Sequence, residues 1–152
     1  MRTAYKVLAY LVALEVMVQA AAIAFAAFGL FKWVEDGGTL DKAALESEDV
    51  TFTGLVGFMI HGINGQMLIP LIAIIFLVVS FFAKVPGGSK WAGFVLLAVV
   101  VQVLLGMFAH GTPALGALHG LNALILFGLA LTAAQRARAT SPMATSPEHE
   151  LV

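Results

Sequence analysis

Two near-identical tetrapeptides carry the residues of this chain that are best suited to chemistry. HGIN occupies residues 61–64 and HGLN occupies residues 119–122, so the chain repeats one histidine, one glycine and one asparagine. A neutral imidazole is a common side-chain ligand for metal ions. The repeat therefore predicts that His61 and His119 form a pair of metal ligands.

Both motifs lie in long apolar stretches. The chain has 152 residues, of which 61% are hydrophobic and 11% charged, and its mean hydropathy is +0.97. This composition is too apolar for a soluble domain. A membrane-spanning helix needs about 20 apolar residues, and four such runs occur at roughly residues 7–33, 53–83, 91–110 and 113–134. We therefore predict an all-α fold, an integral membrane antiparallel four-helix bundle.

The same composition excludes several classes of protein. The net charge of −1 leaves no basic surface for nucleic acid. The absence of cysteine excludes disulfides and thiolate metal sites. The first apolar run is too long for a signal peptide and is interrupted by Glu15, so it is interpreted as a membrane anchor.

Charged residues predict the orientation of the four spans. Basic residues flank the chain termini and the turn after the second span: Arg2, Lys6, Lys84, Lys90, Arg136 and Arg138. Cytoplasmic loops are rich in such residues, so both termini are predicted to be cytoplasmic. The acidic segment 35–52 then forms an outer loop, and residues 135–152 are predicted to be a disordered cytoplasmic tail.

Alternate helices of such a bundle lie diagonally across its core, which would make the two motifs face each other. His61 lies about eight residues inside its span and His119 about six, so both are roughly 9 to 12 Å below the outer boundary. Small residues accompany them: Gly57, Gly65 and Gly116. These glycines either clear space for a flat, wide ligand or let helices touch.

Heme is the ligand that best suits two such histidines, because imidazoles from opposite helices can fill both axial positions of the iron. Zinc fits less well, since it needs three or four protein ligands and His110 is the only third candidate. The alternative to a cofactor is that each imidazole is neutral and bonded to a nearby carbonyl or amide, with Asn64 and Asn122 the nearest partners.

His110, near the outer end of the third span, could act on a heme in three ways. It could be an alternative axial ligand, a donor to a propionate or the entry point of a second heme. Because it directly precedes a helix-ending glycine, it could equally cap helix carbonyls.

Glu15 lies near the predicted midplane, where a charged acid costs about 2.5 to 3.5 kcal/mol. Gln19, four residues later, can share its hydrogen bonds. One interpretation is a proton-carrying site that connects the inner half of the protein to the cofactor. The other is a neutral carboxylic acid that holds helices together.

Two further features concern the helices. Gln19 in VMVQ and Gln102 in VVVQ have similar surroundings, which indicates a duplicated hairpin. Pro70 cannot donate to the carbonyl of Gln66, so the second span should bend there.

The stretches FMIHGINGQML, QVLLG and LHGLNA, in spans two to four, resemble one four-helix half of the heme A synthase family. They resemble still more closely small four-span bacterial proteins with the same layout. The resemblance covers roughly residues 52–134 and implies that His61 and His119 are heme ligands. That family's catalytic half has a glutamate and an arginine where this chain has Phe58 and Gly62, and many members have an outer-loop cysteine pair that is missing here. These differences favour heme binding or electron transfer over hydroxylation of a heme methyl group.

We therefore expect a multi-pass protein of the bacterial plasma membrane that binds heme b and transfers electrons. Its partners would be the lipid bilayer, a quinone or redox protein, and a second copy of the chain. One alternative is a heme-modifying or quinone-linked oxidoreductase. Another is a cofactor-free accessory subunit of a membrane complex, in which the two motifs only hold helices together.

Overall fold

The computed structural model describes residues 1–47 and 49–139, and every regular element in those residues is helical. The elements are α1 (Arg2–Glu35), α2 (Lys42–Glu46), α3 (Leu55–Ile63), the π-helical turn η1 (Asn64–Leu68), α4 (Ile69–Ser80), α5 (Gly88–Ala109) and α6 (Pro113–Ala139). Because η1 joins α3 to α4 without a break, Leu55–Ser80 is one long helix. Four helices are thus long and apolar enough to cross a membrane, as the hydropathy of the sequence predicted.

The boundaries differ from the predicted ones mainly at the ends of the chain. Helix α1 begins at Arg2, and α6 continues to Ala139, five residues beyond the end of the predicted span. Arg136 and Arg138 therefore belong to the last turns of α6. Of the tail that was predicted to be disordered, residues 140–152 lie outside the described part of the chain.

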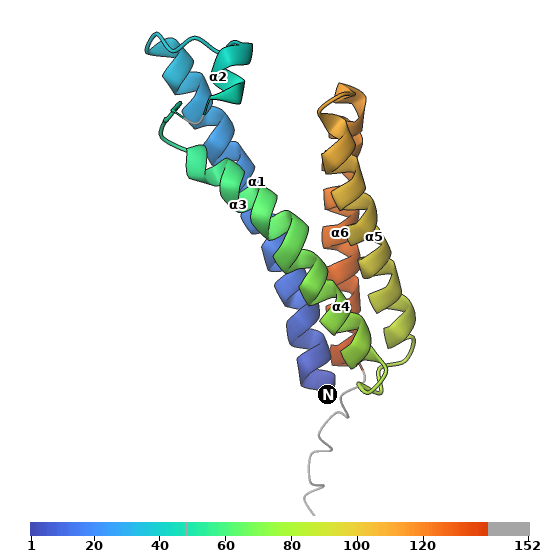
Figure 1. The fold of residues 1–152 in the computed structure, drawn as a ribbon. Helices are drawn as coiled ribbons and strands as arrows, with labels where there is room; N and C mark the ends of the chain where they lie inside the picture. The colour runs from blue at the N-terminus through green and yellow to red at the C-terminus, as the bar shows by residue number, and fades with distance from the viewer. Residues whose placement is uncertain (48, 140–152) are drawn as a thin grey trace, which may run out of the picture.

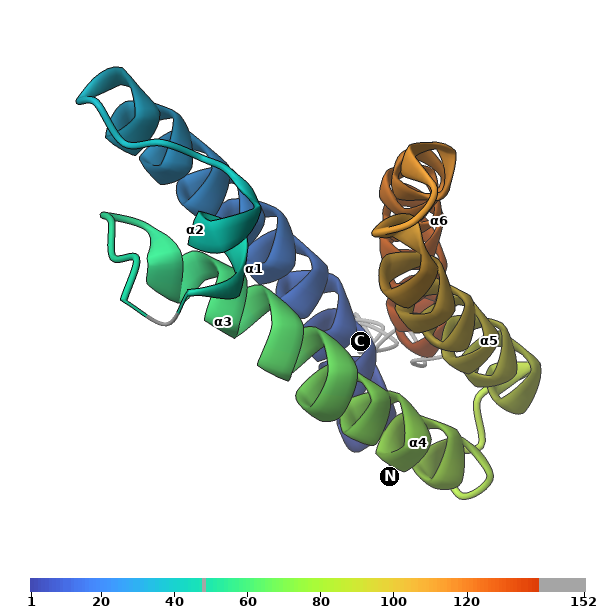
Figure 2. The same cartoon turned by 45° about the horizontal axis from the view of Figure 1, so that its top comes forward.

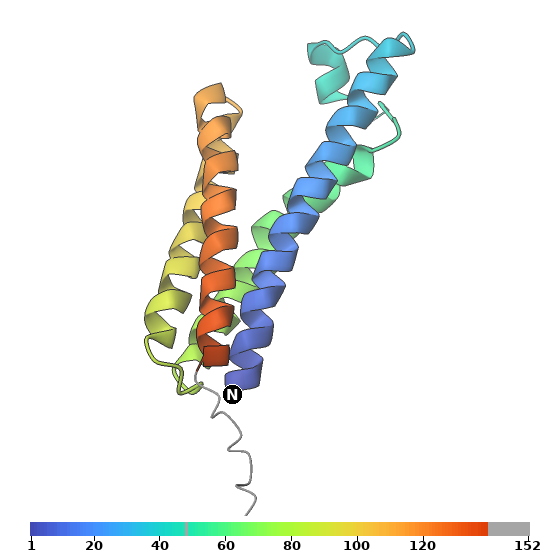
Figure 3. The same ribbon diagram turned by 180° about the vertical axis from the view of Figure 1, so that it is seen from behind.

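The long helices form two hairpins, α1 with α3–η1–α4 and α5 with α6 (Figure 1). Helix α1 packs on α6, and α4 packs on α5, so α4 and α6 lie diagonally. The hairpins meet at the end that holds the N-terminus and diverge toward the other end, as Figures 1 and 3 show from opposite sides. Figure 2 shows the separated ends of the two hairpins from above.

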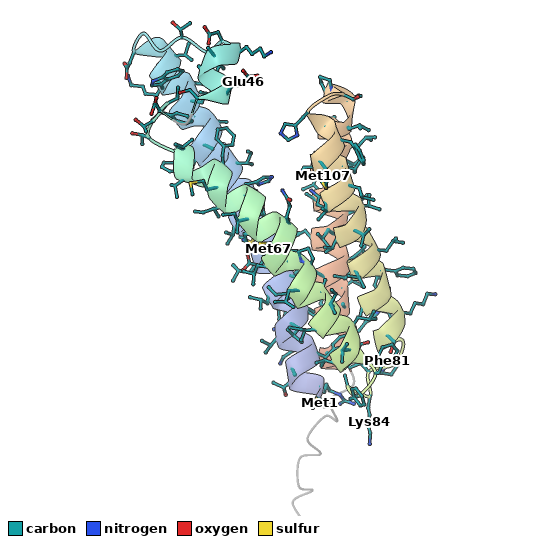
Figure 4. The ribbon with its side chains drawn as sticks, in the orientation of Figure 1. Met1, Glu46, Met67, Phe81, Lys84 and Met107 are labelled. Carbon is teal, nitrogen blue, oxygen red and sulfur yellow. The ribbon has the colours of Figure 1, made fainter. Side chains whose placement is uncertain are left out.

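The two ends of the molecule differ in charge. We call one the basic end, which carries Arg2, Lys6, Lys84, Lys90, Arg136 and Arg138. The other is the acidic end, formed by α2 and the segments around it. Figure 4 marks the first with Met1 and Lys84 and the second with Glu46. At the basic end, Arg136 lies over the ring of Trp91 at 4.6 Å and Arg2 donates to the carbonyl oxygen of Lys84 at 3.3 Å.

The hydrophobic core fills the basic half, where all four long helices meet. Its largest fully buried side chains are Tyr5, Phe76, Leu126, Val12, Val95 and Val99. The rings of Tyr5 and Phe76 lie 4.7 Å apart, and the Tyr5 hydroxyl donates to the carbonyl oxygen of Gly88 at 3.1 Å. Burial of this apolar surface and the satisfied hydroxyl tie the two hairpins together.

In the acidic half, buried contacts form within the first hairpin. A Cβ atom on Gly57 would lie 2.3 Å from the carbonyl oxygen of Ala22, and one on Gly29 would lie 1.7 Å from that of Thr53. These distances permit only glycine, as is usual where membrane helices touch backbone to backbone. The hairpins are therefore held together at the basic end and are separate units toward the acidic end.

Candidate functional site

The two motif histidines come from different hairpins and lie next to each other. His61 is on α3 and His119 is on α6, and their ring centroids are 5.9 Å apart with an interplanar angle of 59°. Both side chains are half-buried. The structure thus brings the predicted pair together, just beyond the apolar core.

Each histidine is held by the same kind of hydrogen bond. Nδ1 of His61 lies 3.2 Å from the carbonyl oxygen of Gln19, and Nδ1 of His119 lies 3.0 Å from that of Gln102. A carbonyl oxygen can only accept, so Nδ1 of each ring must carry the hydrogen. In the neutral ring Nε2 is then the unprotonated nitrogen, and it is the atom free to bind a metal. A backbone bond at the other nitrogen is the usual way to orient a ligating histidine.

In the second hairpin, the asparagine bonds to the neighbouring helix rather than to its histidine. The amide nitrogen of Asn122 donates to the carbonyl oxygen of Ala98 at 2.9 Å and to Oε1 of Gln102 at 2.7 Å. The amide nitrogen of Gln102 in turn donates to the carbonyl oxygen of His119 at 3.0 Å. This closed network fixes α6 on α5 at the level of the histidine.

The first hairpin repeats this arrangement with one difference. Asn64 donates to the carboxylate of Glu15 at 2.7 Å, where Asn122 donates to a backbone carbonyl. Two buried side-chain atoms beside it, Nε2 of Gln19 and Oδ1 of Asn64, have no hydrogen-bond partner within the described residues. The first network is therefore open where the second is closed.

The register of the first helix of each hairpin supports the duplication that the two glutamines indicated. Gln102 and Ala98 lie 83 positions after Gln19 and Glu15. The same offset relates three pairs of buried residues: Tyr5 and Gly88, Ala9 and Ala92, Val12 and Val95. Equivalent faces of α1 and α5 therefore bear the core and the histidine-binding carbonyls.

In the second helix of each hairpin, the core residues follow the histidine at a fixed spacing. This spacing is one residue longer in the first hairpin, and η1 accommodates the extra residue. The buried residues Ile69, Ala73, Phe76 and Ser80 follow His61 by 8, 12, 15 and 19 positions, whereas Leu126, Ala130, Ala133 and Ala137 follow His119 by 7, 11, 14 and 18. A π turn closes its hydrogen bonds over five residues instead of four and so holds one extra residue. In this turn the N–H of Ile69 donates to the carbonyl of Asn64. The bend expected at Pro70 stays a prediction.

The glycines predicted at the site have different roles. Gly57 lies in the contact with Ala22 described above, so it packs helices rather than lining a ligand site. Gly116 is exposed, and a Cβ there would approach only Ala109, at 3.9 Å. Gly65 lies against the side chain of Gln19, because a Cβ atom on Gly65 would lie 3.2 Å from Oε1 of Gln19. The packing interpretation therefore holds for Gly57, and the structure does not place Gly116 at the histidine pair.

Three other glycines lie beside the histidines. A Cβ on Gly62 or Gly120, each directly after a histidine, would meet no atom within 4 Å. A Cβ on Gly106 would lie 3.1 Å from Cε1 and 3.2 Å from Nδ1 of His119. Nothing in the sequence alone singles out Gly106, although its spacing of four residues from Gln102 places both on one face of α5.

His110 is not part of this site. It is the C-cap residue of α5 and is exposed. It lies eight residues beyond Gln102, or about 12 Å further along the helix toward the acidic end. The structure thus brings together two of the three histidines considered from the sequence.

The arrangement offers two protein ligands, not three. Among residues 1–47 and 49–139, no group of three or more His, Asp or Glu side chains could hold a metal ion. Zinc sites take at least three such ligands. The pair is better matched to a group that supplies its remaining metal ligands itself, as a porphyrin does.

Comparison with known proteins yields no match: no family model, curated protein or solved structure matches the chain. The resemblance to heme A synthase therefore rests on the motifs alone. The function has to be argued from the site.

Proposed function

We propose that this chain is a membrane-embedded heme b protein with His61 and His119 as its two axial ligands. The observation that carries the proposal is the paired imidazoles, each with Nδ1 committed to a backbone carbonyl. This leaves two unprotonated Nε2 atoms, contributed by two different hairpins, to bind one metal.

The spacing supports the proposal. With imidazole nitrogens about 2.0 to 2.1 Å from a metal, two rings on opposite sides of it have centroids roughly 6 Å apart. The observed separation is 5.9 Å. The divergence of the hairpins toward the acidic end (Figure 1) agrees with a wide, flat group entering between them.

The residues around the pair favour electron transfer. A bound heme would supply a one-electron couple. With His61 and His119 both engaged in holding it, the group would supply electron transfer rather than oxygen chemistry. The carbonyls of Gln19 and Gln102 fix both rings and increase their basicity as ligands, and the network around Asn122 limits their movement.

We also propose that the four helices cross the bacterial plasma membrane as an antiparallel bundle with the basic end in the cytoplasm. The collection of arginine and lysine at that end supports this orientation. His61 and His119 each lie six residues from the acidic-end start of their helices, about 9 Å along them. The site would then be near the outer face, as the resemblance to heme A synthase implies.

The test is the visible spectrum of protein purified in detergent from heme-replete cells. We expect a low-spin Soret band and a sharp reduced α band, both lost in His61→Ala and in His119→Ala. His110→Ala is the matched control and should keep both bands.

A colourless, well-folded preparation would overturn the proposal and leave the cofactor-free subunit. Rapid reduction by a quinol would instead point to a quinone-linked oxidoreductase that uses the same site.

A further inference from the structure

The two hairpins differ in one chemical respect at their matched networks. Four residues before each glutamine, the second hairpin presents the backbone carbonyl of Ala98 and the first presents the carboxylate of Glu15. Both accept a hydrogen bond from the amide of the motif asparagine. Only Glu15 can gain or lose a proton there.

The side-chain amides of the two asparagines also differ in how firmly hydrogen bonds fix their orientation. The amide nitrogen of Asn122 makes two hydrogen bonds, which fix its orientation. The amide nitrogen of Asn64 makes one, to Glu15, and its Oδ1 has no partner. Asn64 can therefore donate to a charged carboxylate or, with its amide turned over, accept from a protonated one. Nε2 of Gln19, one helical turn after Glu15, also has no hydrogen-bond partner within the described residues.

We propose that Glu15 and Asn64 form a proton-binding site whose occupancy is linked to the charge at the paired histidines. When one electron from an external one-electron donor enters the heme site, the Glu15 carboxylate takes up one proton from water and becomes a neutral acid. The proton then compensates the added negative charge, and release of the electron reverses the uptake. The coupling to the electron rests on the proposed function, whereas the proton site itself does not.

Protons should reach Glu15 from the acidic end. The side chains between Glu15 and the basic end are the apolar core, including Val12, Val95 and Phe76. Two buried side chains in the described part of this core carry a hydroxyl, and each donates it to a backbone carbonyl: Tyr5 to Gly88 and Ser80 to Leu77. This arrangement runs against a path through the inner half, which one of the two interpretations of Glu15 requires, because both hydroxyls are committed to backbone carbonyls and the other buried side chains around them are apolar.

Few other ionisable groups could explain a proton linked to this site. Helix α4 and η1 carry none, and the remaining groups on the elements packed against α1 are His61, His119, Arg136 and Arg138. The two arginines are engaged at the basic end, over Trp91 and Tyr10. On α1 itself, Tyr10 is five residues away, about 7.5 Å along the helix.

The first test uses heme-free, full-length protein in lipid nanodiscs and dicyclohexylcarbodiimide, which modifies protonated carboxylic acids in apolar surroundings. We expect peptide mapping to find the reagent on Glu15, with less modification as the pH rises. Absence of modification at Glu15 would overturn the proton site, whether or not the protein binds heme.

The second test measures the midpoint potential of the heme-loaded protein against pH in a dithionite titration. The potential should fall as pH rises, by up to about 59 mV per pH unit, the one-electron equivalent of a tenfold change in proton concentration. Glu15→Gln keeps an acceptor for Asn64 but cannot titrate, so its potential should vary less with pH.

Glu35→Gln is the matched control, an exposed acid of the same helix, and should behave as the unaltered protein. Equal slopes in Glu15→Gln and the unaltered protein would overturn the coupling. Failure to bind heme, with Glu15 still modified, would instead overturn the proposed heme function and leave the proton site standing.

Discussion

A histidine in a membrane helix can bind a metal only if one ring nitrogen is unprotonated and the ring is held in position. Here the carbonyls of Gln19 and Gln102 meet both conditions, because each fixes the hydrogen on Nδ1. For His119, the absent side chain of Gly106 adds a third condition, since Cε1 of the ring lies only 3.1 Å from where a Cβ would be.

Gly106→Val should push the His119 ring out of place. Overpacking of this kind costs about 1 to 3 kcal/mol, which corresponds to a loss of roughly 5- to 150-fold in heme affinity. Heme titration of the apoprotein, followed at the Soret band, measures the loss.

Gly93→Val is the matched control on the same helix, because a Cβ there meets no atom within 4 Å. Similar heme affinities in the two variants would show that the ring does not depend on Gly106.

Among the elements, η1 compensates for a difference in spacing. The core residues lie one position further from the histidine after His61 than they do after His119. Without η1, the extra residue would rotate His61 by about 100° relative to the buried face of α4. The π turn keeps both the histidine and the core residues Ile69 and Phe76 facing their partners. The π turn ends at Leu68, two residues before Pro70. Pro70 has no N–H and so cannot make the backbone hydrogen bond that a regular α-helix would form at this position.

Removal of the extra residue should therefore be tolerated. We expect the deletion of Gln66, combined with Pro70→Ala, to fold as a regular α-helix and to retain the heme spectrum. Deletion of Ala123 from α6, which has no π turn, should rotate His119 away from its partners and abolish the spectrum. Circular dichroism and the Soret band of both variants provide the measurements. Loss of heme from both deletions alike would contradict this role of η1.

At the scale of the whole molecule, the core and the site occupy different levels. Apolar packing joins the hairpins at the basic end, and the histidine pair lies where they begin to separate. A ligand that bridges the hairpins would therefore add to the stability of the divergent half, since it binds the folded form only.

Sidedness can be tested cleanly because the chain has no cysteine. We expect Thr39→Cys, exposed at the acidic end, to react with a membrane-impermeant maleimide added outside intact cells. Thr3→Cys, exposed at the basic end, should react only after the cells are opened. The reverse pattern would place the histidine pair near the cytoplasmic face.

The sequence by itself determined the four long apolar helices, the two charged ends and the proximity of His61 to His119. These follow from hydropathy, charge and repetition, which act along the chain and need no knowledge of contacts. The repeated motifs and the two glutamines also pointed to a repeated hairpin, whose shared register the buried positions of α1 and α5 now support.

Only the tertiary structure decided which atoms hold the histidines. The sequence suggested Asn64 and Asn122 as partners, whereas the carbonyls of Gln19 and Gln102 fill that role. It could not separate Gly57, which packs α1 on α3, from Gly106, which makes room for a ring. Every residue has a carbonyl and every glycine lacks a Cβ, so their roles depend on what the neighbouring helix brings within 3 to 4 Å, and that distance is set by packing rather than by residue type.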